Sequence, residues 1–411
     1  MSAIIRILVS IVMTAGIVAG SHLHAESFEL KIKKIKITDK NNDIFPEMAL
    51  SSLKRLDIEE PRFRSENPQR FKTFVGEGNT CPLVFAVDEK KGTGKGYDFL
   101  YADVNVTGNL VEGRRIPGKN SSTGGWFEAL DFPCLDIRLP MEEGEKPIDL
   151  PLSVRFHMLK GSTVAWLYLT SLCILEGQVQ LGESKVKMFV FDADCNGIFG
   201  GKAKVVGSKM SGDRIWIGEG APTPETACAE SVPLGKYFCF DGDYYEFVFH
   251  RNSRVDIKKA EVPLGKIEVN QAGFLLELVQ EDGVVYAESL KSNEIPVPAG
   301  QYRVNAASFR KKYKGALWTL EGATNPRSKL FDVKPGERTT IDIGPPLKLV
   351  IRADIGRRGS SLMASLGFVI KGSQDEEYTY LRKDGKKVDL PSITIRDSKN
   401  RIMDKGRFEY G

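Results

Sequence analysis

The stretch of the chain with the most specific chemistry is residues 191–199, Phe-Asp-Ala-Asp-Cys-Asn-Gly-Ile-Phe. Oxygen-bearing side chains occur there at every second position. A glycine, Gly197, stands where a tight loop must turn sharply. The oxygen ligands on offer are the side chains of Asp192, Asp194 and Asn196 and the backbone carbonyl of Ile198. Oxygens at this spacing form the first half of a calcium-binding loop.

The second half of that pattern is missing, because the twelfth position, which calls for a bidentate glutamate, is Ala203. Asp213, in the run Gly-Asp-Arg-Ile at 212–215, is the best replacement. Two or three carboxylates make a modest site, with a Kd of about 10⁻⁴ to 10⁻³ M. The sequence therefore predicts Ca²⁺ at this loop. The alternative is an Asp/Asn/Gly turn whose side chains bond to their own backbone.

A fainter copy of the loop lies upstream, at residues 103–110. It aligns with 192–199 so that Gly108 falls on Gly197, and both copies follow an aromatic-rich stretch. This match indicates an internal repeat of strand plus loop. The weaker ligand set would be Asp103, Asn105 and Thr107, of which only Asp103 is charged. An eroded structural turn is the competing interpretation.

Alternation of apolar and polar residues with a period of two dominates the chain and predicts β-strands. We expect strands at residues 28–37 with a bulge at 33–34, 83–87, 99–104, 154–158, 164–169, 186–191, 214–217, 244–250 and 266–269. The one short helix candidate is 48–56. The pattern predicts an all-β protein, built of several Ig-like or prealbumin-like β-sandwich modules in tandem with few helices.

The N-terminus predicts export. Residues 1–25 contain one basic residue, an apolar run over 7–18 and a small-residue exit, which together are typical of a secretory signal peptide. The apolar run is shorter than the ~20 residues that a membrane span needs. We therefore expect a periplasmic, cell-surface or extracellular protein with no integral membrane segment after cleavage.

Net charge and cysteine content narrow the possible classes of protein further. The net charge of +4 is too small to indicate nucleic-acid binding. The basic run 310–314 is either a solvated hairpin end or a contact for an anionic polymer. An even number of cysteines, six, allows up to three disulfides in an exported protein, with Cys228–Cys239 the best candidate pair. Free buried thiols are the alternative.

Two proline-containing stretches, at 260–263 and 344–346, suggest domain boundaries. They divide the mature chain into an N-terminal β-rich domain (26–259) with the two related loops, a β-sandwich module (260–345) and a C-terminal β module (346–411). The run Pro-Ala-Gly-x-Tyr-x-Val at 298–304 resembles the turn-into-strand of prealbumin-like and Cna-B-like sandwich modules. That resemblance implies a spacer, a stalk or a binding module.

Several motifs follow one another in a fixed order: Gly94-Lys95-Gly96-Tyr97-Asp98 with Asp103 and Asn105, the loop 191–199, Gly212-Asp213-Arg214-Ile215, the run 298–302 and Gly406-Arg407-Phe408-Glu409-Tyr410-Gly411. Their order is similar to that of a family of exported, uncharacterised proteins of planctomycete-type bacteria. The resemblance implies all-β modules and metal loops, and no activity. Family members continue past the terminal Phe-Glu-Tyr-Gly, which leaves open whether the last module is complete.

No catalytic motif emerges from the sequence. His157 and His250, the histidines beyond position 25, cannot build a three-histidine zinc site, and no Gly-x-Ser-x-Gly is present. The first hypothesis is a non-catalytic structural or adhesive protein, stabilised by calcium, with a cell-surface glycan or protein as partner. The alternatives are a glycan hydrolase with two carboxylates and a carbohydrate-binding protein. The latter would use Trp126, Trp166, Trp216 and Trp318, for which core packing is the competing interpretation.

Overall fold

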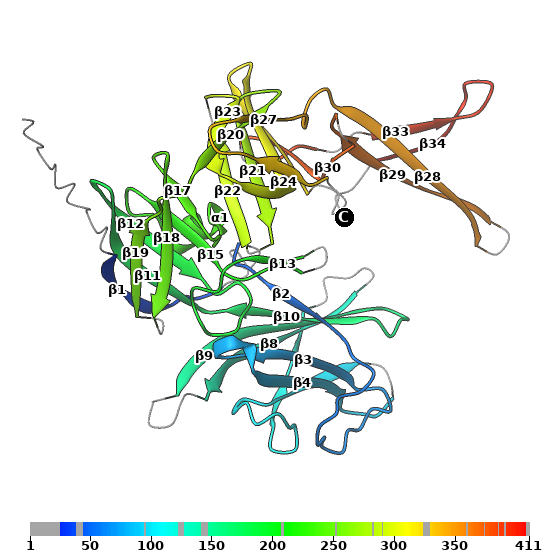
Figure 1. The fold of residues 1–411 in the computed structure, drawn as a ribbon. Coiled ribbons are helices and arrows are strands. Elements are labelled where there is room, and N and C mark those ends of the chain that lie inside the picture. Colours follow the sequence, from blue (N-terminus) through cyan, green and yellow to red (C-terminus); the bar gives the residue numbers. More distant parts are fainter. Residues whose placement is uncertain are drawn as a thin grey trace, which may run out of the picture.

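The computed structural model describes residues 25–407, apart from 38–43, 94–95, 122–126, 141–146, 207–208, 251–252, 282, 290, 324–328, 359–360, 374, 385 and 390–391. Most of this chain is antiparallel β-sheet (Figure 1), so the predicted all-β fold is confirmed. The described part holds one α-helix, α1 (Pro224–Ala229), and one short 3-10 helix, η1 (Glu77–Asn79). None of its helices is long and apolar enough to cross a membrane. Residues 1–24, all but the last residue of the predicted signal peptide, lie outside the described residues.

The first sandwich packs a five-stranded sheet on a four-stranded one. The larger sheet has the order β2 (Met48–Ser51), β10 (Ala165–Ser171), β9 (Ile148–Leu159), β8 (Phe127–Leu139) and β7 (Lys119–Asn120). The smaller has the order β3 (Gln69–Val75), β4 (Cys81–Glu89), β5 (Tyr97–Ala102) and β6 (Arg114–Pro117). Alternate residues of both sheets meet in a first core that contains the fully buried Phe71, Phe85 and Phe156.

The helix predicted over 48–56 is wrong, because its first residues form strand β2. Met48 pairs with Leu169 and Leu50 with Leu167 across the β2–β10 ladder. Both apolar side chains pack on the first core, so their spacing of two, rather than a helical spacing, decides the local structure.

An eight-stranded sheet forms the second part of the N-terminal domain. Its order is β16 (Val232–Pro233), β15 (Arg214–Gly218), β12 (Ser184–Phe191), β11 (Cys173–Leu181), β1 (Glu26–Lys34), β19 (Arg254–Lys259), β18 (Asp243–His250) and β17 (Phe238–Phe240). Strand β1 pairs with β11 as far as Lys34 without a shift of register, so the bulge predicted at 33–34 does not form. Residues from both halves of the sheet, such as Ile215 and Phe247, share a second core, so the sheet curls around it.

The other face of this sheet carries an outer cluster. Phe189 and Phe191 alternate with Met188 and Val190 of the second core, and they pack on the opposite side against α1. Strand β12 is therefore buried on both faces, which explains its continuous apolar run.

The third module is a sandwich of a three-stranded and a seven-stranded sheet. The first has the order β23 (Glu294–Pro298), β20 (Leu264–Val269) and β27 (Arg338–Ile341). The second has the order β22 (Gly283–Ser289), β21 (Phe274–Gln280), β24 (Gly300–Tyr313), β25 (Ala316–Ala323), β31 (Tyr380–Lys383) and β32 (Lys386–Lys387), with β26 (Phe331–Val333) beside the start of β24. Its third core contains Tyr302 and Val304 on one face of β24, and the Tyr302 hydroxyl donates to the Pro298 carbonyl at 2.8 Å.

Long hairpins make up most of the remaining chain. Strands β28 (Lys348–Arg358) and β29 (Ser361–Lys371) pair along their length, with β30 (Glu377–Tyr378) at the base. Strands β33 (Ser392–Arg396) and β34 (Ile402–Arg407) form a second ribbon, and both ribbons project from the third module (Figure 1). Strands β31 and β32, from beyond residue 346, complete the sheet of the third module instead.

The predicted disulfides do not form, since the six cysteines are all free thiols. Cys228 lies in α1, where its thiol donates to the Ile44 carbonyl at 3.3 Å. Cys239 lies on β17 opposite Tyr244 and packs on the third core. The expected pair is therefore split between two packing clusters rather than joined across one hairpin.

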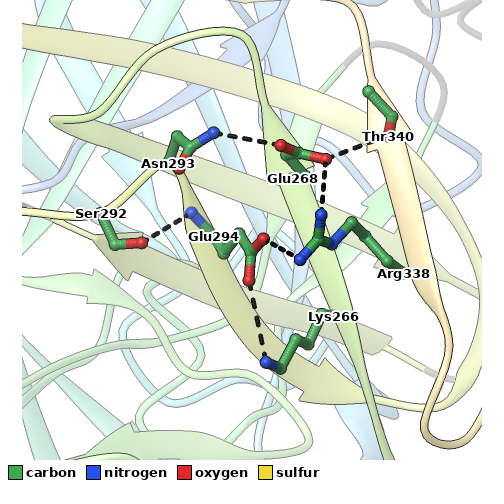
Figure 2. Close-up of polar contacts among 7 residues, drawn as sticks. All are labelled: Lys266, Glu268, Ser292, Asn293, Glu294, Arg338 and Thr340. Atoms are coloured by element: carbon green, nitrogen blue, oxygen red, sulfur yellow. Dashed lines mark hydrogen bonds and ion pairs between the residues drawn. The ribbon is translucent and has the colours of Figure 1, made fainter.

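Charged side chains on the outer face of β20 form a diagonal network (Figure 2). Glu268 lies opposite Glu294, and Lys266 lies opposite Arg338, which are two like-charged pairs that destabilise a sheet when left alone. Arg338 contacts Glu294 at 2.5 Å and Glu268 at 3.7 Å, while Lys266 contacts Glu294 at 3.7 Å. The ion pairs therefore neutralise both carboxylates across the strands.

We expect Arg338→Gln to lower the free energy of unfolding by about 1 kcal/mol, because it leaves Glu268 and Glu294 facing each other. Urea unfolding of the chain measures this. Lys334→Gln is the matched control, since the Lys334 ammonium pairs with Glu337 at 3.8 Å and both side chains are exposed. Equal losses in the two variants would show that the network adds nothing to ordinary surface charge.

Candidate metal centre

Strand register brings the carboxylates of the candidate site together. Phe191, the last residue of β12, pairs with Arg214, the first residue of β15. Asp192 and Asp213 therefore lie at the same end of this strand pair. Asp194 joins them, and one carboxylate oxygen from each of the three lies within 4.8 Å of the others.

The loop that carries Asp192 is closed by its own side chain. The two carboxylate oxygens of Asp192 accept the backbone N–H groups of Asn196 and Gly197, each at 3.0 Å. Cys195 and Gly197 take the left-handed conformation, with φ of 52° and 80°, which allows the chain to wrap around the carboxylate. Each oxygen keeps a further lone pair after accepting one hydrogen bond.

Asp213 is held in the same way, by backbone groups of the loop. Its Oδ2 accepts the N–H groups of Gly200 at 2.7 Å and Gly201 at 2.9 Å, and its Oδ1 accepts that of Ala193 at 3.3 Å. A side chain at Gly200 would overlap Phe249, so only glycine allows this approach. The glycine doublet was the sequence signal for these donors, and our sequence analysis missed it.

The remaining predicted ligands are arranged less favourably. Asp194 accepts the amide Nδ2 of Asn196 at 3.2 Å through Oδ2, and its Oδ1 is buried with no hydrogen-bond partner. The amide oxygen of Asn196 accepts the N–H of Ile198 at 2.7 Å. The structure thus brings Asp192, Asp194 and Asp213 together, while Asn196 presents an N–H to Asp194 and accepts the backbone N–H of Ile198.

Burial makes the charged form of the cluster costly. Desolvation, followed by the negative charge of Asp194, raises the pKa of Asp192 to about 7. Burial and then the charges of Asp192 and Asp194 raise the pKa of Asp213 well above its usual range. Burial also raises the pKa of Asp194. Three carboxylates that are all ionised need a compensating positive charge, and otherwise they hold protons.

A buried hydroxyl accompanies the cluster. Ser171, at the end of β10, is 6% exposed, and its buried hydroxyl oxygen lies outside hydrogen-bond geometry with any described group. It lies close enough to Asp192 to lower the pKa of that carboxyl. The hydroxyl adds a neutral oxygen beside the three carboxylates.

The loop also joins three cores of the N-terminal domain. Phe191 packs in the outer cluster, Cys195 in the first core and Phe199 in the second core. The backbone carbonyl of Asn196 accepts the N–H of Gly76, which precedes η1, at 2.8 Å. A change of loop geometry would therefore disturb both sandwich layers and the curled sheet.

The upstream loop has the same backbone and lacks the charge cluster. Asp103 accepts the N–H groups of Thr107 at 2.9 Å and Gly108 at 2.7 Å, the same relative positions that Asp192 uses. Val106 and Gly108 have φ of 53° and 78°, matching Cys195 and Gly197. Asn105 and Thr107 are exposed, and among the described residues no group of three acidic, histidine or cysteine side chains gathers at this loop.

A cleft of about 530 Å³ borders the carboxylate cluster. Ala193 and Asp213 line it, together with Arg214, Met210 and Cys228. Asp192 and Asp213 are buried and Asp194 is half-buried, and Asp213 borders the cleft.

Comparisons with protein families, with curated proteins and with solved structures find no match to this chain. Its class, a tandem β-sandwich protein with a buried acidic triad, therefore rests on its own fold and geometry.

We expect Asp103→Asn to destabilise the metal-free chain more than Asp192→Asn. Each change weakens the two equivalent backbone hydrogen bonds of its own loop, at a cost of about 1–3 kcal/mol. Only Asp192→Asn also relieves repulsion with Asp194 and Asp213, which offsets part of the loss. Urea unfolding in chelator above pH 7 tests this difference, and a larger loss in Asp192→Asn would contradict it.

For the metal-free protein in chelator, we expect the free energy of unfolding to fall as the pH rises through neutrality. The folded pKa of Asp192, about 7, exceeds its unfolded value of 3.8, so its contribution is complete below the unfolded pKa and is lost as pH rises through the folded pKa. Unfolding free energies measured from pH 5 to 8 should show this fall in wild type and a flatter profile in Asp192→Asn. A rise with pH in wild type would be incompatible with a metal-free acidic cluster.

Proposed function

We propose that this chain is an exported, non-catalytic structural or adhesive protein whose N-terminal domain is stabilised by Ca²⁺. The observation that carries the proposal is the buried acidic triad at the loop that joins three cores. Export and the relation to exported proteins of planctomycete-type bacteria belong to the same proposal and rest on the sequence patterns.

The chemistry of the donor set favours calcium among the common cations. The oxygens at this site belong to carboxylates and a hydroxyl, which are ligands of hard cations, whereas zinc prefers nitrogen and sulfur. The nearby thiol of Cys195 is directed at the Leu169 carbonyl, 3.4 Å away. Asp192, Asp194 and Asp213 would hold the ion, and the charge of the ion would compensate the repulsion among them.

A carboxylate-based glycan hydrolase remains the alternative, and one cleft bears on it. This cleft, of about 500 Å³, is lined by Glu29 and Glu77 together with His250 and Arg254. Both glutamates are exposed, whereas a general acid needs burial to keep its proton near neutral pH. The exposure of the pair supports the non-catalytic proposal over the hydrolase.

The tryptophans do not make a shared sugar-binding platform in the described chain. Trp166, Trp216 and Trp318 are half-buried and belong to three different sheets. Trp166 contacts Phe127 with ring centroids 6.3 Å apart, and Trp216 contacts Phe189 at 5.9 Å. Trp126, the fourth candidate, lies outside the described residues.

We expect Ca²⁺ to raise the melting temperature of the wild-type chain, by an amount equivalent to about 2.7 kcal/mol at a hundredfold excess over its Kd. Asp194→Asn should abolish most of this shift. The Asp194 carboxylate accepts the side-chain amide of Asn196, whereas the carboxylates of Asp192 and Asp213 cap backbone N–H groups, so the change spares those caps. Thermal unfolding with and without Ca²⁺ measures the effect.

The upstream loop supplies the matched control. Asn105→Asp gives it the same Asp-x-Asp start, yet the position equivalent to Asp213, directly before the paired Arg114, is Gly113. This variant should keep the wild-type response to Ca²⁺. A wild-type melting temperature that ignores Ca²⁺, or an unchanged response in Asp194→Asn, would refute the metal site.

A further inference from the structure

Two basic segments that are far apart in the sequence meet on one sheet of the third module. Strand β25 lies between β24 and β31, and β32 follows β31. The ladders pair Lys311 with Trp318, Trp318 with Lys383, and Lys383 with Lys386. Directly paired residues of an antiparallel sheet point to the same face. Lys311, Trp318, Lys383 and Lys386 therefore form one row, which we call the lysine row.

The positive charge of the lysine row is not balanced. Lys311, Lys383 and Lys386 are exposed, and no ion pair joins them to the described residues. The neighbouring carboxylate of Asp384 accepts the backbone N–H of Leu317 at 2.8 Å. In the network on β20, by contrast, each carboxylate forms an ion pair with a cation. A surplus of charge in one row is a feature that attracts an anionic partner.

An aromatic surface lies within the same row. The Lys383 ammonium lies 5.8 Å from the centroid of the half-buried Trp318 ring. Tyr313, two residues beyond Lys311 on β24 and therefore on the same face, is 56% exposed. Flat rings of this kind present apolar area together with a polar edge to a ligand. The surface therefore offers stacking beside charge.

We propose that the lysine row binds an extended acidic polysaccharide, whose carboxylate or sulfate groups pair with the three lysines while a sugar ring packs on Trp318. Four adjacent strands at ~4.8 Å spacing give the row a span of about 14 Å. That span suits a few sugar units lying across the strands. The proposal names the partner of the adhesive role and in that respect rests on the proposed function.

The residue types favour a polysaccharide over a nucleic acid. The arginines near the row are already paired, Arg310 with Glu288 at 2.9 Å and Arg382 with Glu321 at 3.2 Å. Arginine provides the bidentate geometry that phosphate and base edges select, whereas lysine acts as a compact point charge. The unbalanced charge here is carried by lysine. It therefore suits anionic groups spaced along a chain, without base readout.

The test measures binding of the full chain to two probes, heparin as a sulfated polysaccharide and polygalacturonate as a carboxylated one, at low ionic strength. We expect binding to at least one of them, with an affinity that falls as salt is added. Lys383→Gln combined with Lys386→Gln should weaken it about five- to thirtyfold, through the loss of two surface charge contacts. Equal weakening by Lys258→Gln combined with Lys291→Gln, two exposed lysines elsewhere, would show that only net charge matters.

Further arms separate this proposal from its rivals and from the metal site. Tighter binding to double-stranded DNA or to phosphatidylglycerol vesicles than to either polysaccharide would overturn it, as would absence of polysaccharide binding. Because the lysine row lies on the sheet of the third module, binding should persist in chelator. Loss of the calcium response with retained polysaccharide binding would refute the metal site alone, and the reverse result would refute the lysine row alone.

Discussion

The capping of two backbone N–H groups by the Asp192 carboxylate is the interaction on which the N-terminal domain depends. It fixes a left-handed turn directly after Phe191, which lies in the outer cluster, and this turn sends Cys195 and Phe199 into two further apolar clusters. Strands alone could not achieve this, because alternate residues of a strand reach only two faces. A single local cap thus determines how a sandwich and a curled sheet are joined.

The repeat of this loop at Asp103 separates two properties that coincide at Asp192. The upstream copy has the same caps and the same positive φ values, and Val106 enters the first core as Cys195 does. The fold of the loop therefore requires one carboxylate. The additional carboxylates, Asp194 and Asp213, add repulsion and burial cost, even though Asp213 also caps backbone N–H groups of its loop. Such a cost is understandable where a cation compensates it.

Charge is handled in two ways on the third module. The outer face of β20 arranges like charges opposite each other and neutralises them diagonally through Arg338 (Figure 2). The lysine row places three exposed cations beside the half-buried Trp318. The first arrangement stabilises the sheet by itself. The second lowers its free energy only when an external anion is present, which is the physical distinction between a structural and a binding surface.

The sequence by itself determined the all-β fold and the two capped loops, because alternation and an Asp-to-Gly cap act within a few residues. It did not determine which strands pair. Asp213 meets Asp192 only through the β12–β15 register, and Lys383 joins the row of Lys311 only because β31 pairs with β25. The same limit explains the helix wrongly predicted at Met48, which the pairing of β2 with β10 overrides. Strand partners are chosen by burial across the whole fold, and local periodicity carries no record of that choice.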